Sequence, residues 1–232
     1  MKIPMSNRLL TVCGYVRKGD RVADIGCDHG YLGIYLLVNG IAAHTIESDV
    51  AQGPLDSAMR NARKFHTENA MTFCLSNGAK DIPRDFDTLV CAGMGADTII
   101  SILTDSPWLA DGRYRLILQC QSKRPELRRY LSDHGWRIAR ETLARDGKFI
   151  YTVMDVVYEP GHPLTEAQAY FSPALLADNS PLLPEFCARV IHGISQSVEG
   201  LRRSGSHQLP AGEALLRELN SLAQITQKEI KP

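Results

Sequence analysis

Five short β-rich runs alternate with longer stretches over the first 159 residues, and this alternation limits the fold more than any other feature. Between the second and third runs, GPLDSAMRNARKFH has apolar residues at the spacing of a helix. Strands that alternate with helical segments are typical of a parallel sheet covered by helices. The sequence therefore predicts an α/β fold, with strands at RVADIG, HTIESD, MTFCLS, DTLVCAG and YRLILQ, residues 21–26, 44–49, 71–76, 87–93 and 114–119.

The pattern changes at residues 136–159, WRIARETLARDGKFIYTVMDVVYE. Two strand-like runs flank Asp146-Gly147, a dipeptide that strongly favours a tight turn between antiparallel strands. The sheet is therefore predicted to end in an antiparallel hairpin. A dinucleotide-binding fold would continue with a helix and another parallel strand, whereas a closing hairpin resembles the Rossmann-like fold of class I methyltransferases.

A change of composition after Pro160 divides the chain into two predicted parts, residues 1–160 and 161–232. The second part has no strand-like run and carries two apolar stripes at helical spacing, joined by the polar turn SGSHQLP. It is predicted to form an antiparallel, coiled-coil-like helical hairpin. The stripes are interpreted as core rather than as a partner-binding face. They are Phe186, Val190, Ile191, Ile194, Val198 and Leu201, then Leu215, Leu216, Leu219, Leu222, Ala223 and Ile230.

The charged side chains are unevenly distributed, although 26 basic and 26 acidic residues cancel. Residues 113–148 contain ten Lys or Arg against four Asp or Glu, whereas acidic residues concentrate between Asp81 and Asp111. Such asymmetry predicts a face that binds phosphates, although a merely solvated face would give the same pattern.

The apolar stretches are much shorter than the roughly 20 residues that span a bilayer, and we recognise no signal peptide. The six cysteines form no CxxC pair and have no His-rich partner spacing, so we expect neither a metal site nor disulfides. These features predict a cytoplasmic protein with reduced, mostly buried thiols and no membrane partner.

The segment VADIGCDHGYLG, residues 22–33, is the centre of the predicted site. A strand that ends in Asp24-Ile25-Gly26 and turns through Gly30 into a helix brings its backbone close to a ligand. Dinucleotide sites need a GxGxxG spacing, and here Asp28 would place a carboxylate beside two phosphates. S-Adenosylmethionine (SAM) has no phosphate and carries a sulfonium cation, so the turn favours SAM over NAD.

Further ligand contacts are predicted at the ends of the next strands. Asp49 lies 25 residues beyond Asp24, a suitable distance for a carboxylate that accepts hydrogen bonds from ribose, with Glu47 as a competitor. Asn77 is placed to bond the edge of an adenine, and the glycines of AGMG, residues 92–95, let the backbone approach the reacting groups. Helix capping and ordinary turn chemistry are the alternatives for these residues.

These residues resemble the bacterial tRNA (adenine(22)-N1)-methyltransferase family, often called TrmK, over about residues 6–160. The resemblance is carried, in order, by ADIGCDHGYL, DVAQGPLDSA, AGMGADTII, LILQ and ARDGKFIYTVM, and YFSPALL resembles the start of that family's C-terminal extension. It implies that SAM is bound by Asp24, Gly26, Gly30, Asp49, Asn77, Gly93, Met94 and Gly95, and that Asp28, His29 and Tyr31 face the reacting groups.

The chain departs from that family's pattern in two places. Gln119-Cys120-Gln121 stands where the family typically has QPN, after the fifth strand, where a target base could be contacted. Gly30 and Gly33 stand where alanine and proline are common.

The resemblance implies methyl transfer to N1 of an adenine in tRNA. Asp28 is the first candidate for stabilising the positive charge that develops on the base, ahead of His29 as a base and Tyr31 as a stacking platform. The alternatives are another RNA position, a small-molecule substrate, or a non-catalytic nucleotide-binding module. The oligomeric state stays open, with a monomer favoured. Contacts to the RNA are expected from Arg8, Gln119, Lys123, Arg124, Arg128 and Arg129.

Overall fold

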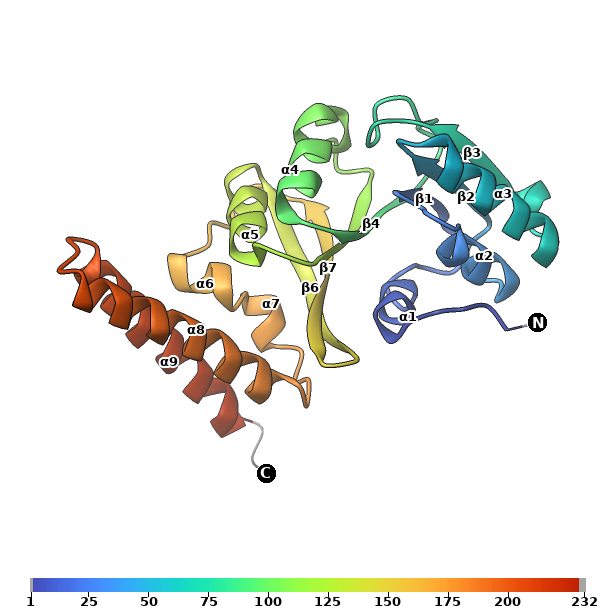
Figure 1. Ribbon diagram of the computed structural model, residues 1–232. Coiled ribbons are helices and arrows are strands. Elements are labelled where there is room, and N and C mark those ends of the chain that lie inside the picture. Colours follow the sequence, from blue (N-terminus) through green and yellow to red (C-terminus); the bar gives the residue numbers. More distant parts are fainter. Residues whose placement is uncertain (1, 230–232) are drawn as a thin grey trace.

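A seven-stranded sheet in the order β3-β2-β1-β4-β5-β7-β6 forms the centre of the computed structural model, which describes residues 2–229 (Figure 1). The first five strands are parallel, and β7 runs antiparallel to its neighbours β5 and β6. The predicted α/β sheet with a closing hairpin is therefore confirmed. The strands are β1 Arg21–Ile25, β2 His44–Asp49, β3 Met71–Leu75, β4 Thr88–Met94, β5 Arg115–Cys120, β6 Trp136–Asp146 and β7 Phe149–Tyr158.

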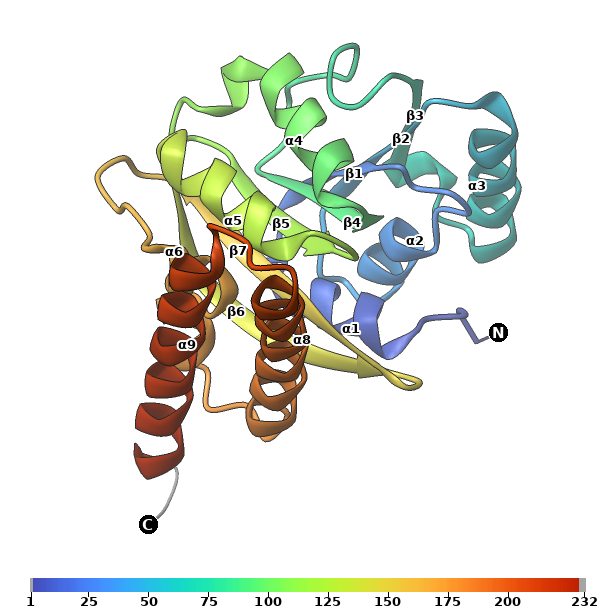
Figure 2. The ribbon, with the colours of Figure 1, turned by 60° about the vertical axis from the view of Figure 1, so that its left-hand side comes forward.

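Helices cover both faces of this sheet (Figure 2). One face is covered by α1, α2 and α3, and the other by α4 and α5. The helices are α1 Asn7–Cys13, α2 Tyr31–Val38, α3 Gln52–Phe65, α4 Ala96–Asp105, α5 Arg124–Asp133, α6 Glu166–Tyr170, α7 Pro173–Leu176, α8 Leu183–Arg203 and α9 Leu209–Glu229, with 3-10 turns at Glu68–Ala70 and Pro107–Leu109.

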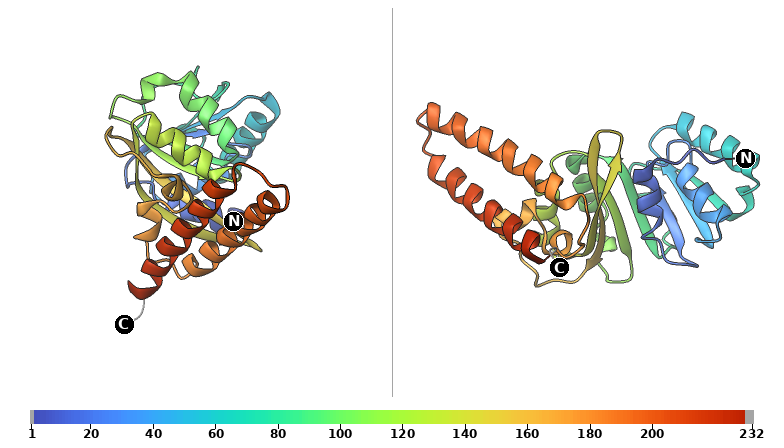
Figure 3. Two further views of the ribbon diagram at one scale, coloured as in Figure 1. Left: turned by 90° about the vertical axis from the view of Figure 1, so that its left-hand side faces the viewer. Right: turned by 90° about the horizontal axis from the view of Figure 1, so that it is seen from below.

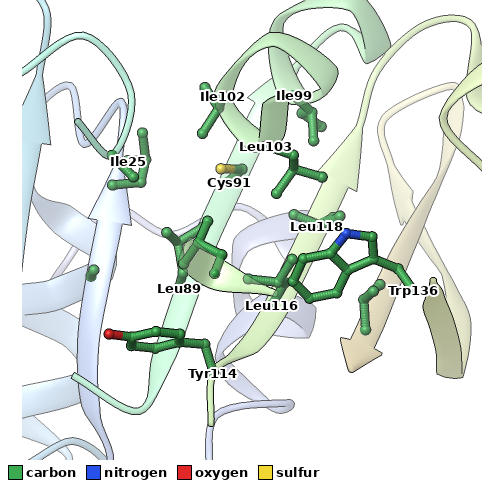
Figure 4. Packing of buried hydrophobic residues seen from close by; sticks show 14 of the residues in the cluster. Ile25, Leu89, Cys91, Ile99, Ile102, Leu103, Tyr114, Leu116, Leu118 and Trp136 are labelled. Atoms are coloured by element: carbon green, nitrogen blue, oxygen red, sulfur yellow. The ribbon is translucent and has the colours of Figure 1, made fainter. Parts of the chain in front are cut away.

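The largest core cluster lies between the sheet and the helices α4 and α5 (Figure 4). Alternate residues of β1 and β4, such as Ile25 and Leu89, face Ile99 and Leu103 of α4. The residues between them face α1 and α2, as period-two alternation requires. This packing on both faces fixes the sheet, and with it the loops at the carboxyl ends of its parallel strands.

The β6–β7 turn differs by one residue from the prediction. Asp146 still pairs with Phe149, so the two turn residues are Gly147 and Lys148 rather than Asp146 and Gly147. A glycine in the first turn position is typical of a type II′ hairpin, which explains why the Asp-Gly signal located the hairpin but not its register.

The C-terminal helices α8 and α9 form a hairpin that projects from the β6 edge of the sheet, away from α1 to α3 (Figure 3). Their predicted stripes pack against each other and against Leu143 and Ile150 of the β6–β7 hairpin. They therefore form a core of their own, joined to the sheet. Ile230 of the predicted stripe lies outside the described residues.

Gly33 of α2 is needed for its lack of a side chain, because a Cβ there would lie 1.9 Å from Oε1 of the buried Glu47. We expect Gly33→Ala to reduce the free energy of unfolding by about 1–3 kcal/mol, the usual cost of overpacking, although alanine is the better helix former. Urea denaturation of the single and double variants measures this effect.

The same substitution in a Glu47→Ala background should cost less, because the crowded carboxyl group is gone and only Oγ1 of Thr45, 2.9 Å from the added Cβ, must still shift. An equal loss of stability in both backgrounds would contradict this account of Gly33.

Candidate active site at the carboxyl edge of the sheet

The turn between β1 and α2 is built from left-handed backbone. Gly26 and Gly30 have φ of +74° and +67°, and Asp28 has φ of +51°. A Cβ on Gly26 would lie 2.5 Å from Cε of Met94, and one on Gly30 would lie 2.9 Å from Cβ of Ala58. Both glycines are therefore required by backbone conformation and by space, and the turn stays close to β4 and α3.

Asp24 is buried at the end of β1, yet it lines a cavity of about 280 Å³ at this edge of the sheet. Burial, and then the charge of Asp49, raise the pKa of Asp24 to about 7. A cation bound beside Asp24 would favour the ionised carboxylate and bring this pKa down. We call this space the Asp28 cavity; its lining includes Arg8, Asp24, Asp28, His29, Tyr31 and Gln121.

A second cavity, of about 480 Å³, adjoins the first at Gly26. We call it the Asn77 cavity, and its polar lining includes Asp49, Ser76, Asn77, Asp97, Thr98 and Ser101. Asp49 is half-buried here, and its Oδ1 accepts a hydrogen bond from the Ala51 amide at 3.0 Å. The structure therefore brings the predicted Asp49 and Asn77 together across one cavity.

Glu47, the predicted competitor of Asp49, is excluded from both cavities. Its side chain is fully buried under α2, and neither carboxyl oxygen has a hydrogen-bond partner among the described residues. Burial and the neighbouring Asp24 raise the pKa of Glu47 well above its usual range. The interpretation of Glu47 as a ribose ligand is wrong, because α2 covers its side chain.

Asp28 and His29 are exposed at the Asp28 cavity. His29 Nε2 lies 3.6 Å from Asp28 Oδ1, and the rings of His29 and Tyr31 are 5.8 Å apart. Gly30, rather than Asp28, is the N-cap of α2, and no capping bond from Asp28 occurs within residues 2–229. Asp28 therefore does not cap α2, and its exposed carboxylate, with His29 as its neighbour, can meet a ligand in the cavity.

The structure corrects the prediction that Gln119 contacts the RNA. Gln119 is fully buried, and its Oε1 accepts hydrogen bonds from Arg8 Nη1 at 2.5 Å and from the Gly93 amide at 3.0 Å. Gln119 therefore positions Arg8 and the end of β4, where Gly93, Met94 and Gly95 lead into α4. The residue of this loop that lines the Asp28 cavity is Gln121, which belongs to the segment expected near a target base but was not itself predicted as a contact.

The structure also corrects the prediction that Arg128 contacts the RNA. The Arg128 guanidinium is 1% exposed, pairs with Glu141 at 2.6 Å and donates to the Ala169 and Tyr170 carbonyls. It joins α5 to β6 and α6, so it is not a phosphate contact. Removing one partner of such a buried pair typically costs about 3–5 kcal/mol of stability.

The three other predicted cations of residues 123–129 differ in their partners. Lys123 pairs with Asp97 at 2.6 Å, and Arg129 pairs with Glu166. Arg124 is half-buried and forms no ion pair with a carboxylate in the described part of the chain. Of these three cations, it is therefore the one most available to an anion.

Within residues 2–229, no group of three His, Cys, Asp or Glu side chains could hold a metal ion. All six cysteines are free, and five of them are buried. None of the described helices is long and apolar enough to cross a membrane.

Comparison with known proteins agrees with this geometry. A family model described as a methyltransferase domain matches residues 5–154. A candidate tRNA methyltransferase of Mycoplasma pneumoniae is 34% identical over 179 residues, which cover 74% of this chain and 81% of that protein. The tRNA (adenine(22)-N(1))-methyltransferase of Bacillus subtilis is 32% identical over 149 residues, 63% of each chain.

A solved structure from Streptococcus pneumoniae, of a candidate tRNA (m1A22) methyltransferase in complex with S-adenosyl-L-methionine, superposes with a TM-score of 0.80. It is 25% identical and covers 95% of this chain and all of the other. The sheet, its closing hairpin and the turn after β1 together define a class I methyltransferase. The relatives of this chain identify the family within that class. The chain belongs to the bacterial tRNA (adenine(22)-N1)-methyltransferases, the TrmK family.

Proposed function

We propose that this chain transfers a methyl group from SAM to N1 of adenine 22 in tRNA. The observation that carries the proposal is the pair of cavities that meet at Gly26, one beside Asp49 and Asn77 and the other beside Asp24 and Asp28. Carboxylates along this edge suit a ligand that carries a cation and no phosphate.

The Asn77 cavity fits the nucleoside part of SAM. The Asp49 carboxylate would accept hydrogen bonds from the ribose hydroxyls, and the Asn77 amide would bond the adenine edge. Asp24, with the turn from Gly26 to Gly30, would lie beside the cationic part. SAM, when bound, supplies an electrophilic methyl group carried by a sulfonium.

The Asp28 cavity would hold the target adenine. N1 of adenine already has an in-plane lone pair, so the chain needs to position the base rather than deprotonate it. Positive charge then builds up on the base, and the Asp28 carboxylate would stabilise it through the exocyclic amino group. Tyr31 and His29 would border the base, which must leave its stack to enter the cavity.

Phosphate contacts come from Arg8 and Arg124 in this proposal. Lys123 and Arg129 would contact phosphate only after leaving their carboxylate partners, Asp97 and Glu166. We assign cofactor binding to residues 1–160 and part of the RNA contact to residues 161–232. A cytoplasmic location goes with a tRNA substrate, and the reduced cysteines agree with it.

SAM affinity should depend on pH through Asp24. In the empty site the Asp24 pKa is about 7, so below pH 7 a proton must leave before the carboxylate can face a cation. Affinity should therefore rise with pH, by up to roughly tenfold per unit below the pKa, and level off above it. Calorimetry between pH 5.5 and 7 measures this rise. The α-amino group of SAM, with an ordinary pKa of about 7.7–8.0, stays protonated in this range and so does not add its own pH dependence.

Asp24→Asn is the matched control, because it keeps the shape and removes the titration. Its SAM affinity should be lower than that of the parent at pH 7 and nearly independent of pH. A slope equal to the parent's would show that another group titrates.

The activity itself is tested with purified protein, labelled SAM and unmodified tRNA transcripts. We expect label in tRNA and none in ribosomal RNA fragments or in the protein. Binding of SAM without transfer to any RNA would favour a small-molecule methyltransferase, and binding of neither SAM nor RNA would favour a non-catalytic module.

A further inference from the structure

A third cavity of about 440 Å³ continues the row formed by the Asn77 and Asp28 cavities. It lies between the loop after β5, the start of β7 and the helix α8, which meet on the side of the molecule seen in Figure 2. Gln121 lines both this cavity and the Asp28 cavity, so the two are adjacent. We call it the Phe149 groove.

The floor of the Phe149 groove includes two aromatic rings of β7. Phe149 is 52% exposed, although it is a large apolar residue at the start of a strand. Tyr151 lies two residues on, with its ring centroid 6.1 Å from that of Phe149. The Arg8 guanidinium, which lines the Asp28 cavity, lies 5.7 Å from the Tyr151 ring. The half-buried Tyr151 ring therefore lies between Arg8, at the proposed adenine site, and the exposed Phe149 ring.

Cationic groups line the walls of the groove. Arg124 donates one hydrogen bond to the Ile150 carbonyl, at 3.3 Å, and has no carboxylate partner among the described residues. Its guanidinium lies 5.1 Å from the Phe186 ring of α8, which limits its orientation. Opposite it, Arg189 of α8 donates to the Lys148 carbonyl at 3.1 Å and pairs with Glu185. A planar aromatic ring can stack on the base of a nucleotide, and a guanidinium beside it can bind the phosphate.

We propose that the Phe149 groove binds a nucleotide next to the methylated adenine, with its base stacked on Phe149 and its phosphate at Arg124. This rests on the proposed function, since it names a second contact to the same tRNA. The occupant adjoins the target because Gln121 lines both the groove and the Asp28 cavity. The positive lining of the groove favours an anionic partner over an apolar one. Its exposed aromatic ring favours a stacked RNA base over an acidic peptide.

The test measures the affinity of the parent and of two Phe149 variants for fluorescently labelled tRNA. Phe149→Ala should weaken binding about tenfold through the loss of stacking, and Phe149→Trp should retain the parent's affinity. Val38→Ala is the control, because it removes another exposed apolar side chain, 53% exposed, at the end of α2 and outside the three cavities. A parent-like melting temperature and SAM affinity show that the Phe149 variants are folded.

The position of the nucleotide is tested by removing a base from the RNA. A tRNA with an abasic residue beside adenine 22 should bind the parent about tenfold more weakly, with no further loss in Phe149→Ala. Parent-like tRNA affinity in Phe149→Ala, or losses that simply add, would overturn the proposal. Binding is measured without methyl transfer, so an inactive parent would refute the proposed function while these affinities still decide the role of the groove.

Discussion

Asp28→Asn should slow single-turnover methyl transfer by about two orders of magnitude, the scale of losing one charged contact in a transition state. Asparagine keeps the shape of the side chain and is tolerated at φ of +51°, so the turn should persist. What is lost is the negative charge that offsets the positive charge developing on adenine. Rapid-quench measurements with enzyme in excess over tRNA isolate this step.

Asp133→Asn is the matched control, because it neutralises an exposed carboxylate at the end of α5, away from the three cavities. It should react at the parent's rate. Since Asp28 does not cap α2, stability should be unchanged in both variants. Full transfer activity in Asp28→Asn would remove the carboxylate from the mechanism.

Asp49→Ala should weaken SAM binding at least about tenfold. The half-buried carboxylate lines the Asn77 cavity, and two charge-assisted hydrogen bonds to ribose would each contribute about 1.5–3 kcal/mol before losses. Calorimetry on the folded variant measures the dissociation constant. An unchanged value would contradict the assignment of Asp49 to the ribose.

The same variant has a second expected effect, on the pH dependence of binding. The charge of Asp49 is, after burial, the second cause of the raised pKa of Asp24. Its removal should therefore move the pH at which SAM affinity levels off to a lower value. An unchanged pH would contradict the contribution of the Asp49 charge to the raised pKa of Asp24.

The sheet could be predicted from the sequence because each of its strands is a short apolar run bounded by polar turns. The predicted runs at residues 21–26 and 44–49 match β1 and β2 to within one residue. The sequence favoured Asp49 as the ribose ligand but could not exclude Glu47, because residues two apart in a strand point to the same face. Only the packing of Gly33 against Glu47 shows which carboxylate is covered by α2.

The basic segment was harder to interpret, since a count of charges does not separate buried from exposed cations. Arg128 lies next to Leu127 and three residues before Leu131, on the buried face of α5, and this helical spacing was a signal that it faces the core. No sequence signal indicated the Phe149 groove. Its walls come from β7 and α8, about 40 residues apart, and they meet only through tertiary packing such as that of Lys148 and Arg189.

Mapping the methylated nucleotide tests the central claim most directly. Unmodified tRNA is incubated with the protein and SAM, digested and analysed by mass spectrometry, and a parallel reverse transcription locates the position at which N1 methylation blocks base pairing. We expect 1-methyladenine at position 22 alone, and no product from a transcript that carries guanine there. Methylation at a different position, or of the guanine-substituted transcript at the parent's rate, would contradict the account.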